Sequence, residues 1–418
     1  MKLLHTSDWH LGATLYRQTR APDHDAVIAE IIEVARRFGP DLICHTGDLF
    51  DRARPATEEI ARAGHALREL ASIAPVVVVC GNHDSASLLD ALNVYMRISG
   101  GSQRVHFVAR VRSPRDGVLQ FPTRRGHTIR LAALPFQHAH LMTDAFGDPT
   151  QWGTDYNAQV RGIEAALGEA LLANFNPITD VAVFAAHLYV GGADYCGSER
   201  GMHVDGTYAT DLDAVPTVSY AAFGHLHKPQ PLPGKRVTGR YAGSPIALDF
   251  GEIYDKKSVV LVEAEPGRPA SIETVRLTAG RRLRRFHGTL QQLEALASEI
   301  TDDLCLVTVA TPTHIPTLIE QVRRLLPHAT LLDVHPARSD APTDILTANQ
   351  VDADAEPNLT QLFTEFIAER GTRTAGPQQV LDAFTRVLAA VEEDREPVFA
   401  EEALLTTAAS ADSSEAPA

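Results

Sequence analysis

Cysteine is scarce in this sequence of 418 residues, and its four copies are scattered. They stand at Cys44, Cys80, Cys196 and Cys305, and the first two lie inside apolar runs. No pair has the close spacing of a zinc ribbon or a redox motif, which excludes a disulfide scaffold and a thiolate metal site. We expect reduced core cysteines in a cytoplasmic protein.

Long hydrophobic runs and targeting signals are also missing. No apolar stretch reaches the roughly 18 residues that would suggest a membrane helix, so we expect no membrane partner. Met1 is followed almost at once by an apolar run that ends in Asp8, without a secretory signal. A Walker motif is absent, so any dependence on ATP must come from a partner.

Positive charge is in deficit, with 38 Lys and Arg against 53 Asp and Glu and a formal net charge of −15. This balance alone argues against a nucleic-acid ligand, because duplex binding depends on neutralising phosphates. Two segments are nevertheless basic: Arg104, Arg110, Arg112, Arg115, Arg124, Arg125 and Arg130, then Arg276, Arg281, Arg282, Arg284 and Arg285. They either contact DNA beside a cleft or are solvated charges that protect strand edges.

Five polar clusters are present, and each directly follows a short apolar run that is typical of a buried strand. The clusters are Asp8-x-His10, Gly47-Asp48-x-x-Asp51, Gly81-Asn82-His83-Asp84, His187 and Gly224-His225-x-His227. Loops that leave adjacent strands of an open α/β sheet converge on one crevice. The five clusters are therefore predicted to share one site.

The donor types at this site favour a metal centre. The predicted ligands are Asp8, His10, Asp48, Asn82, His187, His225 and His227. Carboxylates with imidazoles suit manganese, iron or zinc. Seven donors are too many for one ion that keeps a position open, so we expect two divalent ions that share Asp48 and hydrolyse a phosphoester. A single motif is weak, since a lone histidine such as His187 is more often a core residue; the ordered combination carries the prediction.

Five stretches carry a resemblance to a known family: residues 5–12, 47–52, 81–85, 223–229 and 241–245. Over about residues 1–265 the chain resembles the calcineurin-like metallophosphoesterases, and among them the SbcD-type DNA repair nucleases. The resemblance implies that Asp8, His10, Asp48 and His227 hold one ion and that Asp48, Asn82, His187 and His225 hold the other. Manganese is the expected metal, with magnesium and iron as alternatives.

The resemblance also assigns His83 as the catalytic residue, off the metals and facing the scissile phosphate. The alternative is that His83 only hydrogen-bonds its loop. Asp84 is expected to orient His83 or the turn. Position 51 is Asp, as is usual in the bacterial branch, whereas some archaeal and eukaryotic relatives have a histidine there. Asp51 then either supports a ligand or caps a helix.

The expected fold is α/β, a two-sheet β-sandwich flanked by helices, with a small α/β cap domain and C-terminal helices. Helical spacing predicts helices at 24–38, 57–70 and 158–174, and alternation predicts strands within 101–135 and 241–262 and at 272–277. We expect a nuclease domain at 1–277, a cap domain at 278–340, C-terminal helices within 341–395 and a disordered acidic tail at 396–418.

The cap sequence predicts strands at 285–288, 304–310 and 330–335 and helices at 290–300 and 316–326. Its four histidines, His287, His314, His328 and His335, are not assigned to a metal. Two amphipathic helices are predicted at 358–371 and 377–391. They either pack on each other or on the cap, or they bind a partner. The resemblance implies that the partner is the SMC-like ATPase SbcC, in a heterotetramer that contains a homodimer of this chain.

The predicted function is that of a DNA nuclease, a 3′-to-5′ exonuclease on duplex ends and an endonuclease on single strands or hairpins. Phosphoester hydrolysis follows from the residues, whereas substrate and polarity follow from the resemblance. One alternative is a small-molecule or cyclic-nucleotide phosphodiesterase with the same site. Another is a non-catalytic scaffold of a repair complex, against which the intact set of donors argues.

Overall fold

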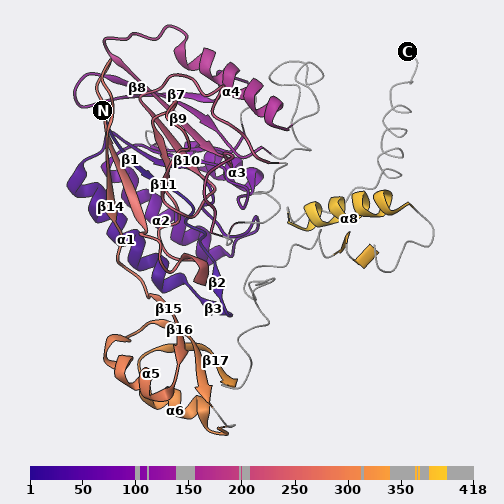
Figure 1. The fold of residues 1–418 in the computed structure, drawn as a ribbon. Helices are drawn as coiled ribbons and strands as arrows, with labels where there is room; N and C mark the ends of the chain where they lie inside the picture. The colour runs from indigo at the N-terminus through magenta and orange to yellow at the C-terminus, as the bar shows by residue number, and fades with distance from the viewer. Residues whose placement is uncertain are drawn as a thin grey trace. The chain divides into compact units, whose positions relative to one another are not determined.

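Two six-stranded sheets stack face to face in the computed structural model, with helices on their outer faces (Figure 1). The structure describes residues 1–98, 104–110, 113–137, 156–196, 199, 208–311, 315–338, 363–364, 366–367 and 376–392. The chain divides into two units, Met1–Glu356 and Pro357–Ala418. Both sheets belong to the first unit.

The first sheet has the order β14-β13-β1-β4-β5-β6. Strands β1, β4, β5 and β6 are parallel, while β13 runs antiparallel to β1 and pairs with the edge strand β14. The strands span Lys2–Thr6 (β1), Leu42–His45 (β4), Val76–Val79 (β5), Val105–Val108 (β6), Ser258–Glu263 (β13) and Ser271–Arg276 (β14). β4 and β5 are buried throughout, which explains their short, continuously apolar sequences.

The second sheet has the order β11-β12-β10-β9-β8-β7. Its four central strands are parallel, and the edge strands β7 and β11 run antiparallel to their neighbours. The strands span Val118–Pro122 (β7), Thr128–Leu134 (β8), Asp180–His187 (β9), Tyr220–Gly224 (β10), Gln230–Pro231 (β11) and Gly239–Tyr241 (β12). Parallel strands in both sheets bring several strand C-termini to one edge of the sandwich.

Three apolar layers hold the sandwich together. Side chains from both sheets, such as Leu3 and Val183, form the central layer. The helices α1 (Ala21–Phe38), α2 (Thr57–Ile73) and α3 (Ala86–Ile98) cover the first sheet, and α4 (Tyr156–Leu172) covers the second. The predicted two-sheet sandwich flanked by helices is confirmed.

A separate three-stranded parallel sheet forms the core of the cap region, residues 283–338. Its strands are β15 (Leu283–Gly288), β16 (Leu304–Thr311) and β17 (Thr330–Arg338), and the helices α5 (Leu290–Leu296) and α6 (Leu318–Leu325) pack on them. Thr289 and Gln292 form a capping box that starts α5. The predicted elements of this region are all present, within a few residues of the expected bounds.

In the C-terminal unit, the predicted second amphipathic helix is α8 (Pro377–Glu392). Its apolar residues Val380, Leu381, Phe384, Val387 and Leu388 are half-buried, and the polar residues between them are exposed. Most of the predicted first helix, 358–371, and the tail 396–418 lie outside the described residues. Among the described helices, none is both long and apolar enough to cross a bilayer.

The prediction of strands within residues 241–262 is confirmed only at the two ends of this range. Strand β12 ends at Tyr241 and β13 begins at Ser258, and a short 3₁₀ helix, η4 (Phe250–Glu252), lies in the buried loop between them. The Asp249 side chain caps η4 by accepting from the Gly251 N–H. Buried apolar residues such as Ile246 give this loop the composition of a strand.

The buried carboxyl of Glu164 gives a test of the helix packing on the second sheet. Glu164 on α4 is 1% exposed, and neither oxygen has a hydrogen-bond partner among the described residues. Burial raises its pKa to about 8. The folded chain therefore keeps a proton that the unfolded chain releases above about pH 4.5, and stability falls as the pH rises toward 8.

We expect Glu164→Gln to remove this pH-dependent loss. The variant should exceed wild type in free energy of unfolding by roughly 1–3 kcal/mol at pH 8, with a smaller difference at pH 5. Denaturant titrations at both pH values measure the effect, and Glu169→Gln on the exposed face of α4 is the control. If the difference in free energy of unfolding between Glu164→Gln and wild type does not change with pH, the raised pKa of Glu164 is contradicted.

Candidate metal centre

All eight predicted site residues lie at the C-terminal ends of strands from both sheets. They follow β1 (Asp8 and His10), β4 (Asp48), β5 (Asn82 and His83) and β10 (His225 and His227), and His187 is the last residue of β9. Seven of them are buried and His83 is half-buried. The structure brings the eight residues together in one pocket, as the short distances between their side chains show.

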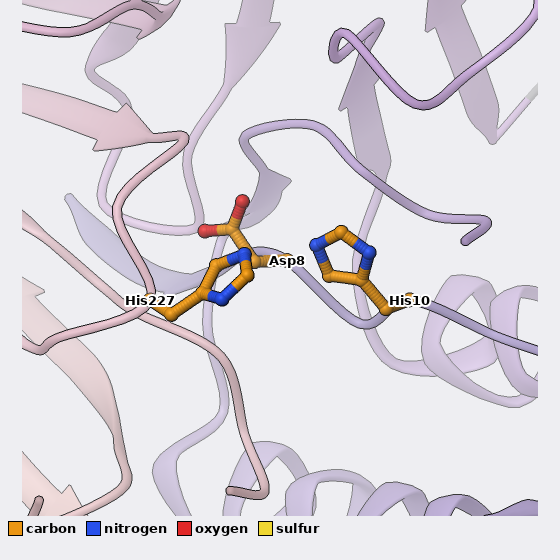
Figure 2. A group of neighbouring side chains, drawn as sticks. All are labelled: Asp8, His10 and His227. Carbon is orange, nitrogen blue, oxygen red and sulfur yellow. The ribbon is translucent and has the colours of Figure 1, made fainter. Parts of the chain in front are cut away.

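Asp8, His10 and His227 form a first cluster, in which one possible ligand atom from each residue lies within 4.8 Å of the others. Figure 2 shows Asp8 and His10 on one stretch of chain and His227 on another. The ring centres of His10 and His227 are 4.8 Å apart. Asp8 accepts the His225 N–H at 3.1 Å through Oδ1. Its Oδ2 has no hydrogen-bond partner in the described part of the chain.

Asp48, Asn82, His187 and His225 form a second cluster. The Asn82 Oδ1 atom lies 2.9 Å from His187 Nε2 and 2.8 Å from His225 Nδ1. Asp48 Oδ2 lies 3.3 Å from His187 Nε2 and 3.6 Å from His10 Nε2. The Asp48 carboxylate thus lies against residues of both clusters.

The backbone at four of these residues is left-handed, a conformation that non-glycine residues rarely adopt. The φ angles are 51° at Asp8, 48° at His10, 52° at Asp48 and 102° at His225. Each such residue costs on the order of 1–3 kcal/mol and persists only when the surroundings enforce it. The strain therefore concentrates where the loops turn their donors into the pocket.

Two glycines let the loops approach one another closely. A Cβ atom at Gly81 would overlap the Asp48 carboxylate and backbone nitrogen, and one at Gly47, where φ is 105°, would overlap the His187 ring. Gly81 has no positive φ, so its requirement is space beside Asp48 rather than a left-handed backbone. Any side chain at either position would push two ligand loops apart.

Two buried hydrogen-bond groups hold these loops in place. The Thr46 carbonyl oxygen lies 2.7 Å from His187 Nδ1, so Nδ1 donates to it. The other ring nitrogen, Nε2, then faces Asp48. Asp84 accepts from the N–H groups of Leu49, Phe50 and Gly81 at 3.0–3.2 Å. Burial, with the nearby charge of Asp48, raises the pKa of Asp84 to about 6. Asp84 therefore orients the turn, one of its two expected roles.

His83 lies beside both clusters. Its Nδ1 is 2.8 Å from the Asp51 carbonyl oxygen, its backbone N–H donates to Asp48 Oδ1 at 2.8 Å, and its ring centre is 4.6 Å from that of His10. One atom each of His10, Asp48 and His83 also falls within 4.8 Å, so proximity alone does not exclude His83 as a ligand. Asp51 Oδ1 lies 3.4 Å from His10 Nδ1, which favours support of a ligand over helix capping.

Two carboxylates that the sequence analysis did not select lie against His227. Glu252 Oε1 is 3.2 Å from His227 Nδ1, and Glu199 Oε1 accepts the His227 backbone N–H at 3.0 Å. Burial would lower the pKa of His227, but Glu252 and the other nearby carboxylates raise it to about 9. Glu252 was missed because its segment was assigned to strands. The sequence did offer one signal: Glu252 and Lys257 are opposite charges placed close together beside apolar residues.

Several arginines of the two basic segments are paired with acids of this chain. Arg130 is buried, with its guanidinium 3.7 Å from Asp180. The other pairs are Arg110 with Asp90, Arg125 with Glu265, Arg281 with Asp23 and Arg284 with Asp303. For Arg130, Arg281 and Arg284 the burial of the pair favours a structural role over DNA contact, whereas Arg110 and Arg125 lie in exposed pairs.

Two family profiles match the sequence. Residues 1–229 match the calcineurin-like phosphoesterase family, and residues 279–370 match a family described as the type 5 capsule protein repressor C-terminal domain. The first match contains every residue of the pocket named above except Glu252. The fold is thus that of a calcineurin-like phosphoesterase.

Three curated relatives are described as the SbcD component of the nuclease SbcCD. The protein from Bacillus subtilis is 31% identical over 68% of this chain and 71% of its own length. The protein from Rhodobacter capsulatus is 33% identical over 64% of this chain and 67% of its own length. The protein from Escherichia coli K12 is 25% identical over 93% of this chain and 98% of its own length. The chain belongs to the calcineurin-like phosphoesterase family, in the branch formed by the SbcD nucleases.

The buried histidines predict that metal binding competes with protons. Burial would lower the pKa of His187, but Asp48 raises it to about 9, close to the value for His227. Below pH 9 both rings carry protons that must leave before a nitrogen can ligate a metal. Mn²⁺ affinity should therefore rise with pH, by up to about tenfold per unit for each proton released.

Calorimetric titration with MnCl₂ at pH 6, 7 and 8 measures this effect, and buffers of different ionisation enthalpy count the released protons. An affinity that is flat across this range, with no proton release, would show that the two histidines are already neutral or are not ligands.

Proposed function

We propose that this chain is the nuclease component of a DNA repair complex and that it hydrolyses phosphodiester bonds with two divalent metal ions. The observation that carries the proposal is the meeting of two donor clusters at Asp48 with His83 beside them. The branch to which the chain belongs supports DNA as the substrate.

The donor set fits a pair of cations. Asp8 Oδ2 and His10 Nε2 are buried and have no hydrogen-bond partner among the described residues, and such atoms are costly unless a ligand satisfies them. We assign Asp8, His10, Asp48 and His227 to one ion, and Asp48, Asn82, His187 and His225 to the other. Manganese is proposed, with magnesium and iron as alternatives, because the donor types suit all three.

In the proposed mechanism, two divalent ions held by these residues would polarise the phosphate and lower the pKa of the attacking water. The Asp51 carbonyl accepts from His83 Nδ1 and so fixes the ring. In its imidazolium form, His83 then donates the Nε2 proton to the leaving oxygen or stabilises the charge on the phosphate. The loops around Asp84 hold His83 and Asn82 at fixed positions relative to Asp48.

The finer activities are proposals from the family. They are 3′-to-5′ exonuclease activity on duplex DNA and endonuclease activity on single strands or hairpins. We place the metallophosphoesterase domain at 1–277, the cap at 278–340 and the helices for an SMC-like ATPase, SbcC, at 341–395. The amphipathic helix α8 (Pro377–Glu392) is the described element for which this role is proposed. A heterotetramer with two copies of this chain completes the proposal.

His83→Ala and Asp48→Ala separate catalysis from metal binding. We expect His83→Ala to lower kcat on duplex DNA by about 10²- to 10⁴-fold, because a proton donor is lost, with Mn²⁺ affinity retained. Asp48→Ala should lower both. His287→Ala in the cap region is the control, since this exposed histidine belongs to no cluster. Wild-type rates in both variants would contradict the assigned roles.

The same assay with blunt duplex, hairpin and bis-p-nitrophenyl phosphate tests the substrate class. Cleavage of DNA supports the proposal. Cleavage of the small ester alone, even with the partner ATPase present, would instead support a small-molecule phosphodiesterase.

Removal of the metal should abolish hydrolysis without unfolding the chain. We expect protein dialysed against EDTA to lose about 99% of its hydrolysis rate or more, since changes beside metal ligands already cost up to about 100-fold. Added Mn²⁺ should restore the rate more fully than Mg²⁺. Circular dichroism checks that the fold remains. Full activity after exhaustive chelation would rule out a metal-dependent reaction.

A further inference from the structure

The short helix η4 lies between the metal pocket and the cap region. Its last residue, Glu252, is 0% exposed, and its first, Phe250, is 3% exposed. Asp249 caps the helix through the Gly251 N–H. Phe250 and Glu252 are therefore both buried in one short helix, with only Gly251 between them.

The Glu252 carboxylate is the centre of a buried network around His227. Its Oε1 lies 3.2 Å from His227 Nδ1, while its Oε2 accepts from Lys257 Nζ at 2.5 Å and from Ser244 Oγ at 3.1 Å. Lys257 Nζ also donates to the His227 carbonyl at 3.0 Å. The network thus holds both the ring and the backbone of a proposed metal ligand.

Phe250 packs on the other side, against the cap region. It shares an apolar cluster with Leu15 of the hairpin β2 (Thr14–Leu15) and β3 (Gln18–Thr19), and with Leu283 and Leu304 of β15 and β16. The Arg285 guanidinium carbon lies 5.5 Å from the centre of the Phe250 ring. The strands of the cap sheet therefore contact the nuclease domain through the helix that holds His227.

The linker into the cap region is anchored on α1. Asp23 accepts from the backbone and side chain of Arg281, and Glu30 accepts the N–H groups of Thr278 and Ala279. Both acids lie on α1. With the linker held there, a shift of the cap sheet about this anchor changes the packing at Phe250.

We propose that Glu252 is a positioning residue for His227 and that η4 couples the packing of the cap region to the metal affinity of the pocket. This inference rests on the proposed metal-dependent function. The chemistry is that of a histidine ligand whose second nitrogen is held by a carboxylate, which fixes the ring and strengthens it as a donor. Displacement of Phe250 moves Glu252 because only Gly251 separates them, and the Asp249 side chain holds the Gly251 N–H.

Calorimetric titration of the full chain with MnCl₂ tests both parts. We expect Glu252→Gln to weaken Mn²⁺ binding by about 10- to 100-fold and Phe250→Ala by about 2- to 30-fold. Phe250→Leu, which keeps an apolar contact, should recover most of the affinity. The double variant should bind no more weakly than Glu252→Gln alone, because Phe250 acts through Glu252.

Two controls separate positioning from loss of stability. Glu164→Gln changes another buried carboxyl, and Phe121→Ala removes a similarly buried ring from β7; both should keep wild-type Mn²⁺ affinity. On DNA, saturating Mn²⁺ should return the kcat of Glu252→Gln to within about twofold of wild type, the result expected when only ligand affinity is lost.

The outcomes are distinguishable. Unchanged affinity in Phe250→Ala overturns the coupling, and unchanged affinity in Glu252→Gln overturns the positioning role. Equal losses in the control variants would falsify both. If Phe250→Ala does not fold, Arg285→Ala, which removes the contact to the Phe250 ring, carries the test of coupling, with an Mn²⁺ affinity below wild type expected. A wild-type chain that binds no Mn²⁺ overturns the proposed function itself, whereas intact wild-type binding confines any failure to this inference.

Discussion

The carboxylate of Asp48 is the contact on which the pocket depends. It accepts the His83 N–H and lies within 3.6 Å of His10 and within 3.3 Å of His187, so loops from both sheets meet at it. Burial would raise its pKa, but the charges of His187 and His83 hold that pKa well below its usual range. An ionised carboxylate in a dry pocket is tolerated only with such partners. The imidazoles around Asp48 are thus needed to stabilise its buried charge as well as for the proposed metal binding.

The rest of the fold keeps these groups close despite the strain of doing so. Left-handed backbone at Asp8, His10, Asp48 and His225 costs free energy, and the loops cannot relax because each follows a strand buried between apolar layers. Short parallel strands end together at one edge, which fixes where each loop begins. A pocket built on such rigid supports is organised before substrate arrives, the condition under which electrostatic stabilisation is most effective.

The sequence predicted the strands and the convergence of the eight residues, because apolar runs that end in polar motifs report local structure directly. It did not predict the partners of those residues. Glu252 reaches His227 across 25 positions of the chain, and its loop has an apolar composition that resembles a strand. The need for glycine at position 81 arises from Asp48, 33 positions earlier. Such contacts depend on tertiary packing, which no local pattern records.

Charge balance connects the pocket to its proposed substrate. The chain is acidic overall, and five arginines of its two basic segments already face acids. The pocket itself contains the carboxylates of Asp8 and Asp48, which repel a phosphate. Divalent cations bound in the pocket would supply positive charge beside the scissile phosphate, so the proposed hydrolase couples substrate binding to metal loading. In this view, the groups that hold His227 and Asp48 influence DNA affinity although they touch no DNA.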